Sequence, residues 1–187
     1  AAEAGAAPRS IGVDTWGVDF GLLGADGGLL ARPRCYRDAR NAGMSRRVAE
    51  RVGADRLHAR TGSMHQDIDS LCQLAAVAEH EPQLLERARR LLFIPGLLRR
   101  LLCGAEGADR TFASTSQMYD AAAGEWATDI LAELNLPADI LPEVVDGPVV
   151  VGTLGERLQW ATGLGPVPIV AGCGHDTGAA FGTCLPE

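Results

Sequence analysis

The sequence predicts one α/β unit, with helices in its middle and strands near both of its ends. Strand-like apolar runs occur at 10–14, 149–151 and 167–170, and apolar residues at helical spacing dominate the chain between them. Neither an internal repeat nor a low-complexity linker divides the sequence. Hydrophobic residues make up 47% of the 187 residues, which is enough for one sizeable core. Helices and strands in such an order bury their apolar faces against one another in a layered α/β domain.

The first elements are predicted to be a short strand and a hairpin. Residues 10–14, Ser-Ile-Gly-Val-Asp, are short, apolar and β-branched at their centre. Residues 18–23 continue as a strand, a Gly-rich turn follows at 24–28, and Leu29-Leu30 resumes the apolar pattern. Two apolar runs joined by such a turn favour a hairpin over residues 18–30.

Four segments farther along carry apolar side chains at helical spacing, which predicts a helix in each. The segments are 44–57, 70–79, 82–92 and 126–134. Pro82 suits the first turn of the third helix, and Pro95-Gly96 is predicted to interrupt it before a further turn or two at 97–102. A helix near 156–161 is predicted between the last two strands.

Composition and charge exclude several classes of function. The 24 acidic residues outnumber the 17 Lys and Arg, and the net charge of −7 argues against a nucleic-acid-binding surface or an anchor on anionic membranes. No apolar run approaches the roughly 18–20 residues that span a bilayer, and the first ten residues lack the pattern of a secretory leader. We therefore expect a cytoplasmic protein with no nucleic-acid or membrane partner, and its oligomeric state stays open.

The cysteines and histidines predict no metal site. The five cysteines are widely spaced without a C-x-x-C pair, so we expect free thiols in a reducing compartment. No two of the four histidines have the i, i+4 spacing of a helical ligand pair.

A glycine-broken turn follows the last predicted strand and leads into three polar residues. Gly172 and Gly174 allow the backbone to approach a ligand closely, and His175, Asp176 and Thr177 follow. Ligands of open α/β sheets collect at such strand ends. An ordinary N-cap, in which Asp176 or Thr177 caps the next helix, explains the same residues without a ligand.

A second polar set follows the first predicted strand. Asp14, Thr15, Trp16 and Asp19 combine two carboxylates, a hydroxyl and an indole, with Gly17 among them. This set suits a polyhydroxylated ligand, because Asp and Thr bind hydroxyl groups and the indole offers an apolar face to C–H groups. The alternative is a strand-end turn with a core tryptophan.

Both polar sets resemble motifs of the FGGY carbohydrate kinases. Segment 10–23, SIGVDTWGVDFGLL, is similar to the family's strand and substrate loop almost residue for residue, and 174–177 resembles its G-H-D-T. Three further groups keep the family's order and spacing. They are Tyr36-Arg37-Asp38 with Arg40, then Thr61-Gly62 with Leu71 and Gln73-Leu74, and finally Ala113-Ser114-Thr115 with Gln117. The resemblance extends over residues 10–182.

This resemblance implies a ribonuclease H-like domain of the actin-like ATPase superfamily. Members of the family have two such domains around a cleft, of which the first binds most of the sugar and the second most of the ATP. By resemblance, Asp176 is the catalytic base. The residues expected to contact or neighbour the sugar are His175, Thr177, Gly17 (through its backbone), Trp16 and Asp19.

The implied reaction is the phosphorylation of a small-molecule sugar, a ketose such as L-rhamnulose, with ATP and Mg²⁺. Phosphoryl transfer needs mainly positioning and charge stabilisation, and a carboxylate with a pKa near ~3.9 is ionised at neutral pH and can accept the hydroxyl proton. The alternatives are a kinase for another ketose or deoxy sugar, and a non-catalytic sugar-binding module. An actin-like assembly ATPase is disfavoured, because the two polar sets suit a sugar.

The chain departs from the family pattern at its ends and in one internal segment. The first strand hairpin, which contacts ATP phosphates and magnesium, and the ATP-binding second domain have no counterpart in the sequence. We therefore expect residues 1–187 to be a partial N-terminal sugar-binding domain, incomplete at its N-terminus and inactive alone. In segment 63–72, SMHQDIDSLC, four residues stand where an aromatic residue, Pro, Asn and Tyr are usual, and they leave the identity of the sugar open. They are His65, Asp67, Asp69 and Cys72.

Overall fold

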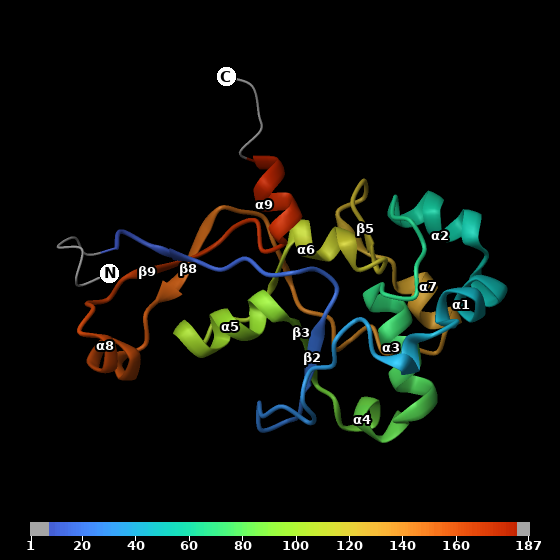
Figure 1. Cartoon of the computed structure of the whole chain (residues 1–187), viewed down its shortest axis with the longest axis horizontal. Coiled ribbons are helices and arrows are strands. Elements are labelled where there is room, and N and C mark those ends of the chain that lie inside the picture. The colour runs from blue at the N-terminus through green and yellow to red at the C-terminus, as the bar shows by residue number, and fades with distance from the viewer. Residues whose placement is uncertain (1–7, 183–187) are drawn as a thin grey trace.

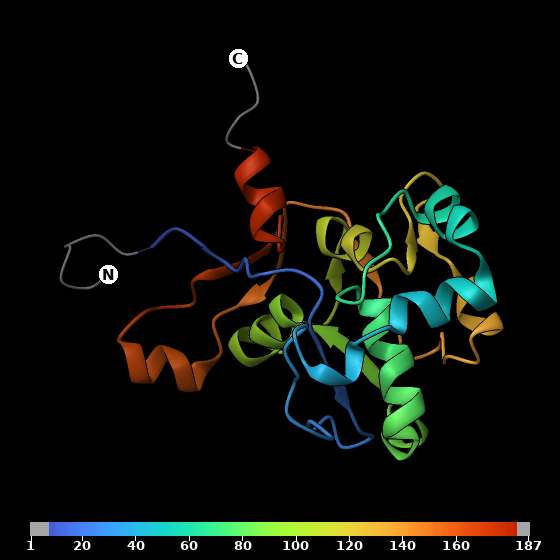
Figure 2. The same ribbon diagram turned by 45° about the vertical axis from the view of Figure 1, so that its right-hand side comes forward.

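The computed structural model describes residues 8–182 and confirms the predicted mixture of helices and strands (Figure 1). A small sheet and helix α8 (Glu156–Thr162) lie at one end of the molecule, and a group of helices lies at the other (Figures 1 and 2). That group comprises α1 (Met44–Val52), α2 (Ala54–Thr61), α3 (Ser70–His80) and α7 (Thr128–Glu133). Within the described residues, no helix combines the length and the apolar character that crossing a membrane requires.

Strands from the two ends of the described chain form the small sheet. Its order is β1 (Ile11–Gly12), β9 (Pro168–Ala171) and β8 (Val149–Thr153), with β1 parallel and β8 antiparallel to β9. Ile169 pairs with Ile11 and is fully buried, so the central strand anchors the sheet in a small apolar cluster. The strands predicted near both ends of the chain are confirmed, and their pairing brings these ends together.

The prediction of a hairpin over residues 18–30 is wrong, because its first strand pairs mainly with a different segment. Strand β2 (Phe20–Leu23) pairs along its whole length with β3 (Arg90–Phe93), in antiparallel orientation. Only an isolated bridge between Leu23 and Leu29 remains of the expected hairpin, and Leu29 is half exposed. All four residues of β2 are buried, and β3 pairs with each of them, whereas the return segment offers only two apolar residues.

The helix predicted over 82–92 is too long, because α4 (Pro82–Arg87) ends before β3. Leu91, Leu92 and Phe93 are all buried. Three consecutive buried side chains point to both faces of an extended strand, whereas a surface helix would turn one of them to solvent. Tertiary packing against β2 therefore overrides the helical spacing of the leucines.

Two glycine and proline positions also shift the predicted helix boundaries. The helix expected over 44–57 is divided into α1 and α2 at Gly53, whose φ of 89° does not fit a helix. Pro95 does not interrupt a helix but lies in the first turn of α5 (Ile94–Cys103), where its missing N–H costs nothing.

The remaining elements are short. They are η2 (Ala39–Asn41), β4 (Ala108–Asp109), α6 (Arg110–Thr115), β5 (Tyr119–Asp120), β6 (Glu125–Trp126), β7 (Val144–Val145) and α9 (Asp176–Gly182). Strands β4 and β7 are parallel, and β5 and β6 are antiparallel. Trp126, predicted to begin a helix, belongs to β6 instead, and α7 begins at Thr128.

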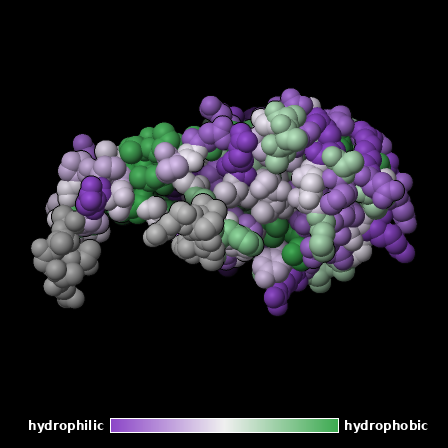
Figure 3. Space-filling view, turned by 90° about the horizontal axis from the view of Figure 1, so that it is seen from above, coloured by the Kyte–Doolittle hydropathy of each residue, from purple (hydrophilic) through white to green (hydrophobic). Residues whose placement is uncertain are grey.

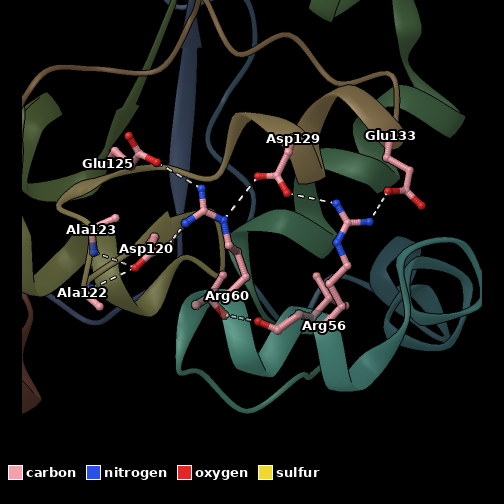
Figure 4. A network of polar contacts seen from close by, with 10 residues as sticks. Arg56, Arg60, Asp120, Ala122, Ala123, Glu125, Asp129 and Glu133 are labelled. Atoms are coloured by element: carbon pink, nitrogen blue, oxygen red, sulfur yellow. Dashed lines mark hydrogen bonds and ion pairs between the residues drawn. The ribbon is translucent and has the colours of Figure 1, made fainter.

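The main core lies among the helices and is closed at its edge by a charged network. Fully buried side chains from α2, α3 and α7, among them Leu57, Leu71 and Ile130, belong to this core. At the surface, Arg56 and Arg60 of α2 reach acidic residues of α7 and the β5–β6 pair (Figure 4). Their partners are Asp129 and Glu133 for Arg56, and Asp120, Glu125 and Asp129 for Arg60.

The sheet end of the molecule carries exposed apolar side chains. Val149 and Val150 of β8 are 37% and 60% exposed, and a hydrophobic patch is visible at this end in Figure 3. Trp160 of α8 is 88% exposed. The helical end is mostly hydrophilic in the same view (Figure 3).

A buried ion pair joins α5 to α6. Arg99 and Asp109 are each 2% exposed, with Arg99 Nη1 lying 3.7 Å from Asp109 Oδ2. Arg99 Nη2 donates to the Gly107 carbonyl at 3.0 Å, and Asp109 Oδ1 caps α6 by accepting from Phe112 N at 3.0 Å. One carboxylate thus neutralises the buried guanidinium and begins the next helix.

We predict that Asp109→Ala lowers the free energy of unfolding by about 3–5 kcal/mol, because the guanidinium of Arg99 stays buried without a counter-charge. Urea unfolding followed by circular dichroism measures this change. Asp146→Ala, which removes an exposed partner of Arg110, is the control and leaves the urea midpoint unchanged. Equal midpoints for the two variants would show that the Arg99–Asp109 pair does not stabilise the fold.

Candidate functional site

Two backbone hydrogen bonds extend the β1–β9 pairing into the two polar segments. Thr15 N donates to the Gly174 carbonyl at 2.9 Å, and Asp176 N donates to the Thr15 carbonyl at 2.9 Å. They form a parallel bridge between Thr15 and His175. Because β1 and β9 run in the same direction, their carboxyl ends meet at one edge of the sheet, where ligands of α/β folds bind.

A cavity of about 360 Å³ opens beside this bridge. Trp16 and Gly17 line it from one polar segment, and His175 lines it from the other. A Cβ atom at position 17 would lie 2.8 Å from His175 Nε2, which is closer than side chains approach one another. Glycine at position 17 therefore allows the imidazole ring to lie against the backbone at the cavity wall.

Asp19 holds Trp16 at the rim of this cavity. The indole Nε1 donates to Asp19 Oδ2 at 2.8 Å, and Trp16 stays 49% exposed. Asp19 is 2% exposed and is not a lining residue, and its Oδ1 accepts from Gln73 Nε2 at 3.3 Å. Burial raises the pKa of Asp19, and the hydrogen bonds from Trp16 and Gln73 partly offset this effect. The carboxylate is thus used to orient the indole.

Asp176 and Thr177 lie at the first turn of α9, outside the lining of the cavity. Both are exposed. Asp176 Oδ1 accepts from Thr177 N at 2.6 Å and lies 3.4 Å from His175 Nε2. No described residue donates a hydrogen bond to Asp176 Oδ2, so this oxygen, next to a cavity-lining residue, is available to accept a proton from a ligand.

His175 is supported from below by α6. Its backbone N–H donates to Thr111 Oγ1 at 3.4 Å, and Thr111 Oγ1 in turn donates to Asp109 Oδ1 at 2.5 Å. The imidazole meets the Phe112 ring edge-on, with centroids 6.1 Å apart. The buried pair between α5 and α6 is therefore connected to the cavity wall through two hydrogen bonds.

The rest of the lining comes from residues that sequence reasoning did not assign to the site. They include Tyr36, Ser63, Met64, Gln66, Asp69 and Thr115. A signal for them existed, since Tyr36 and Thr115 belong to matched motifs and segment 63–72 is the one that departs from the family pattern. The structure makes this departing segment part of the cavity.

Segment 63–72 also brings together three side chains that could hold a metal ion. A ring nitrogen of His65, a carboxylate oxygen of Asp69 and Cys72 Sγ lie within 4.8 Å of one another. The expectation of no metal site weighed histidine pairs and cysteine pairs only, so a mixed cluster at i, i+4 and i+7 was missed.

Two aspartates of this segment have pKa values shifted in opposite directions. Burial raises the pKa of Asp69 to about 6, although its Oδ2 accepts a hydrogen bond from Gln66 N at 2.7 Å. Hydrogen bonds from the Ser45 hydroxyl and from the backbone of Ser45 and Gly43 lower the pKa of Asp67. Asp69 is therefore the carboxylate of this wall that titrates nearest to neutral pH among those with a resolved shift.

Comparisons with known proteins agree with this geometry. Residues 4–182 match the family model described as the FGGY family of carbohydrate kinases, N-terminal domain. The rhamnulokinase of Bacteroides thetaiotaomicron is 37% identical over 179 residues, 96% of this chain and 37% of that protein. The rhamnulokinase of Oceanobacillus iheyensis is 33% identical over 187 residues, 100% of this chain and 39% of that protein. The chain thus spans little more than a third of the length of these curated relatives.

Solved structures of carbohydrate kinases share the fold of this chain and confirm the expected ribonuclease H-like fold. A gluconate kinase from Lactobacillus acidophilus superposes with a TM-score of 0.82 at 18% identity, covering 90% of this chain and 34% of that one. A xyloylose kinase from Brucella ovis superposes with a TM-score of 0.81 at 24% identity, covering 94% of this chain and 36% of that one.

We predict that Asp69→Asn flattens the pH dependence of stability between pH 4 and pH 6. The raised pKa means that the folded chain binds the Asp69 proton more tightly than the unfolded chain does, so the free energy of unfolding falls as pH rises through this range. An amide removes that loss and raises the free energy of unfolding at pH 7 by about 1–3 kcal/mol. Urea unfolding at several pH values, in buffer with a chelator, measures it.

Asp67→Asn is the matched control, because Asp67 lies two residues away and its pKa is shifted in the opposite direction. Its lowered pKa means that Asp67 stabilises the fold above its unfolded pKa and loses this effect as pH falls through the lower folded value. The variant is therefore less stable than the parent at pH 7. An unchanged pH profile in Asp69→Asn would contradict the titration assigned to Asp69.

Proposed function

The chain belongs to the FGGY family of carbohydrate kinases, and we propose that it forms the sugar-binding part of an ATP-dependent kinase for a ketose such as L-rhamnulose. The observation that carries the proposal is the Thr15–His175 bridge, which sets Trp16, Gly17 and His175 on one cavity. The cavity volume of about 360 Å³ falls in the range of small-molecule sites.

The lining of the cavity supports a polyhydroxylated ligand. Trp16 offers a half-exposed indole to the C–H face of a sugar ring or chain, and Asp19 keeps that indole in place. His175 and Asp69 supply polar atoms from different segments of the lining, and Gly17, whose Cβ position is taken by the His175 ring, contacts the sugar through its backbone. Thr177, in the first turn of α9 and outside the cavity lining, contacts the end of the sugar nearest Asp176.

Asp176 is the proposed catalytic base. Its carboxylate is exposed, and no described residue donates a hydrogen bond to Oδ2. The hydrogen bond from Asp176 N to the Thr15 carbonyl fixes the backbone position of the residue. As the sugar hydroxyl oxygen bonds to the transferred phosphorus, its proton passes to this carboxylate. Holding the hydroxyl in line is the second contribution of the residue, because phosphoryl transfer depends mainly on positioning.

ATP is the proposed phosphate donor and Mg²⁺ the accompanying metal, which neutralises phosphate charge when bound. Mg²⁺ prefers carboxylate oxygens and water, and the exposed carboxylate of Asp14 at this sheet edge fits as one of its ligands. We assign most of the ATP-binding surface to a second domain in the whole protein, in keeping with the third of the relatives' length that this chain matches. The reaction belongs in the cytoplasm, where ATP is available.

A kinase for a different ketose or deoxy sugar is the second candidate. The observation that favours it is the wall made by segment 63–72, in which Asp69 lines the cavity and differs from the usual residue of related sequences. A panel of ketoses and deoxy sugars, with kcat/KM measured for each on the whole protein, separates the two. A preference of tenfold or more for another sugar over L-rhamnulose would select the second candidate.

We predict that the 187-residue chain alone binds its sugar but transfers no phosphate. Calorimetry with L-rhamnulose measures binding, and ADP release in the presence of Mg²⁺ and ATP measures transfer. Turnover by the chain alone at roughly 1–100 s⁻¹, typical of kinases, would contradict the proposal that most of the ATP-binding surface lies in a second domain.

We predict that Gly17→Ala weakens sugar binding at least tenfold, because the added Cβ collides with the His175 ring. Gly12→Ala is the matched control, since a Cβ there meets no atom within 4 Å.

We predict that Asp176→Asn in the whole protein reduces kcat by about 10²–10⁴-fold while sugar affinity stays within a few-fold. Asn keeps the size and the capping ability of Asp and removes only its charge and basicity. A coupled assay gives kcat, and calorimetry gives affinity on the same sample. Asp146→Asn, which changes an exposed partner of Arg110 outside the lining of the cavity, serves as the control.

Three outcomes of the Asp176 experiment are informative. A fall in kcat of less than about tenfold means that another group takes the proton. Loss of sugar binding together with kcat means that Asp176 positions the ligand or the loop instead. If the unmodified whole protein binds sugar and releases no ADP, the non-catalytic sugar-binding module is the correct alternative.

A further inference from the structure

His65, Asp69 and Cys72 converge beneath the cavity wall, and the proposed phosphoryl transfer uses none of them as an acid, base or nucleophile. They belong to the stretch from the end of α2 to the first turn of α3, and their ligand-type atoms lie within 4.8 Å of one another. We propose that these three side chains bind one divalent transition-metal ion of the zinc type. The proposal does not depend on which sugar, if any, the cavity binds.

The hydrogen bonds of His65 orient the ring as a metal ligand. Its Nε2 lies 2.6 Å from the Ser45 carbonyl, which can only accept, so Nε2 carries the hydrogen. The lone pair is then on Nδ1, which faces Asp69 Oδ2 at 3.9 Å. Metal-binding histidines characteristically donate their second N–H to a backbone carbonyl or carboxylate in this way.

A second oxygen faces the same ring nitrogen. Gln117 Oε1 lies 2.5 Å from His65 Nδ1, and Gln117 Nε2 is directed to the Met64 carbonyl at 3.4 Å. At this distance a proton lies between the ring nitrogen and the amide oxygen in the metal-free chain. A metal ion at Nδ1 replaces that proton and joins the N, O and S donors of His65, Asp69 and Cys72.

A second layer of contacts fixes this arrangement. The carboxylate of Asp67 accepts from the backbone N–H and the hydroxyl of Ser45, at 2.8 and 2.6 Å, and so holds the carbonyl that receives His65 Nε2–H. Asp69 is held by the backbone N–H of Gln66 at 2.7 Å. Support of this kind is conserved around metal ligands because it sets their orientation.

The electrostatics of the cluster favour a bound cation. Asp69 is 5% exposed and Cys72 is fully buried, and among the described residues the only ion-pair partner of Asp69 is His65. A metal ion supplies the missing positive charge, and the Cys72 thiol proton passes to solvent as the S–metal bond forms.

The donor set selects the class of metal. Thiolate and imidazole together suit Zn²⁺ or Co²⁺, whereas Mg²⁺ and Ca²⁺ take oxygen ligands. The ion can enter through the cavity, because Asp69 forms part of its wall. This site is thus separate in chemistry from the Mg²⁺ that accompanies ATP.

Titration of the metal-stripped chain with Zn²⁺ and Co²⁺ tests the proposal. We expect one equivalent to bind, to raise the melting temperature, and, for Co²⁺, to produce a thiolate-to-metal charge-transfer band. Cys72→Ser abolishes that band and weakens Zn²⁺ binding at least about 100-fold, the upper end of what loss of a supporting contact costs. Cys103→Ser, which changes a half-buried helical thiol outside the cluster, keeps both.

His65→Gln is the second variant, in case Cys72→Ser does not fold, with folding monitored by circular dichroism. It is expected to lose Zn²⁺ affinity to the same extent. The proposal is overturned if the parent chain gives no Co²⁺–thiolate band, or if a folded Cys72→Ser or His65→Gln variant binds Zn²⁺ as tightly as the parent. Mg²⁺ at the same concentrations is expected to produce no melting shift through this cluster.

Discussion

The parallel contact between β1 and β9 is the constraint on which the site depends. It begins at Ile11 and Ile169 in the buried centre of a small sheet and continues through the Thr15–His175 bridge. Each segment alone is a strand end with a few polar side chains, and neither encloses a cavity. Their pairing sets an indole, a glycine and an imidazole around one space, so the chemistry follows from backbone hydrogen bonds rather than from contacts between the side chains.

The rest of the fold supplies the other side of that space. Segment 63–72 is fixed at its end by α3, whose leucines are buried in the main core, and it carries Asp69 to the cavity. From below, Asp109 connects a buried arginine to the residue that supports His175. The cavity is therefore bounded by a large apolar core on one side and by a small sheet on the other, joined through α5 and α6.

The sequence predicted much of this and missed what depends on distant pairing. Strand runs and most helices were found because periodicity is local, but β2 pairs with β3 across about 70 residues, and no turn signal encodes that choice. Trp16, Gly17 and His175 were predicted at the site and line the cavity. Asp19 was also predicted there, but its sequence position alone does not show that it is buried and accepts a hydrogen bond from the Trp16 indole. The cluster of His65, Asp69 and Cys72 was missed, although its i, i+4 and i+7 spacing is that of one helical face, because only histidine pairs and cysteine pairs were considered as metal ligands.

The pairing of β1 with β9 also bears on how the domain is made. A chain leaves the ribosome N-terminus first, and domains fold as units once their long-range partners are available. Among the described strands, residues 11 and 12 pair with residues 169 and 170, so this pairing forms only after residues 169 and 170 have been synthesised. The main helical core can assemble well before then, but Trp16 cannot meet His175. A nascent chain that stalls short of β9 would be largely folded and yet have no finished cavity to offer a ligand.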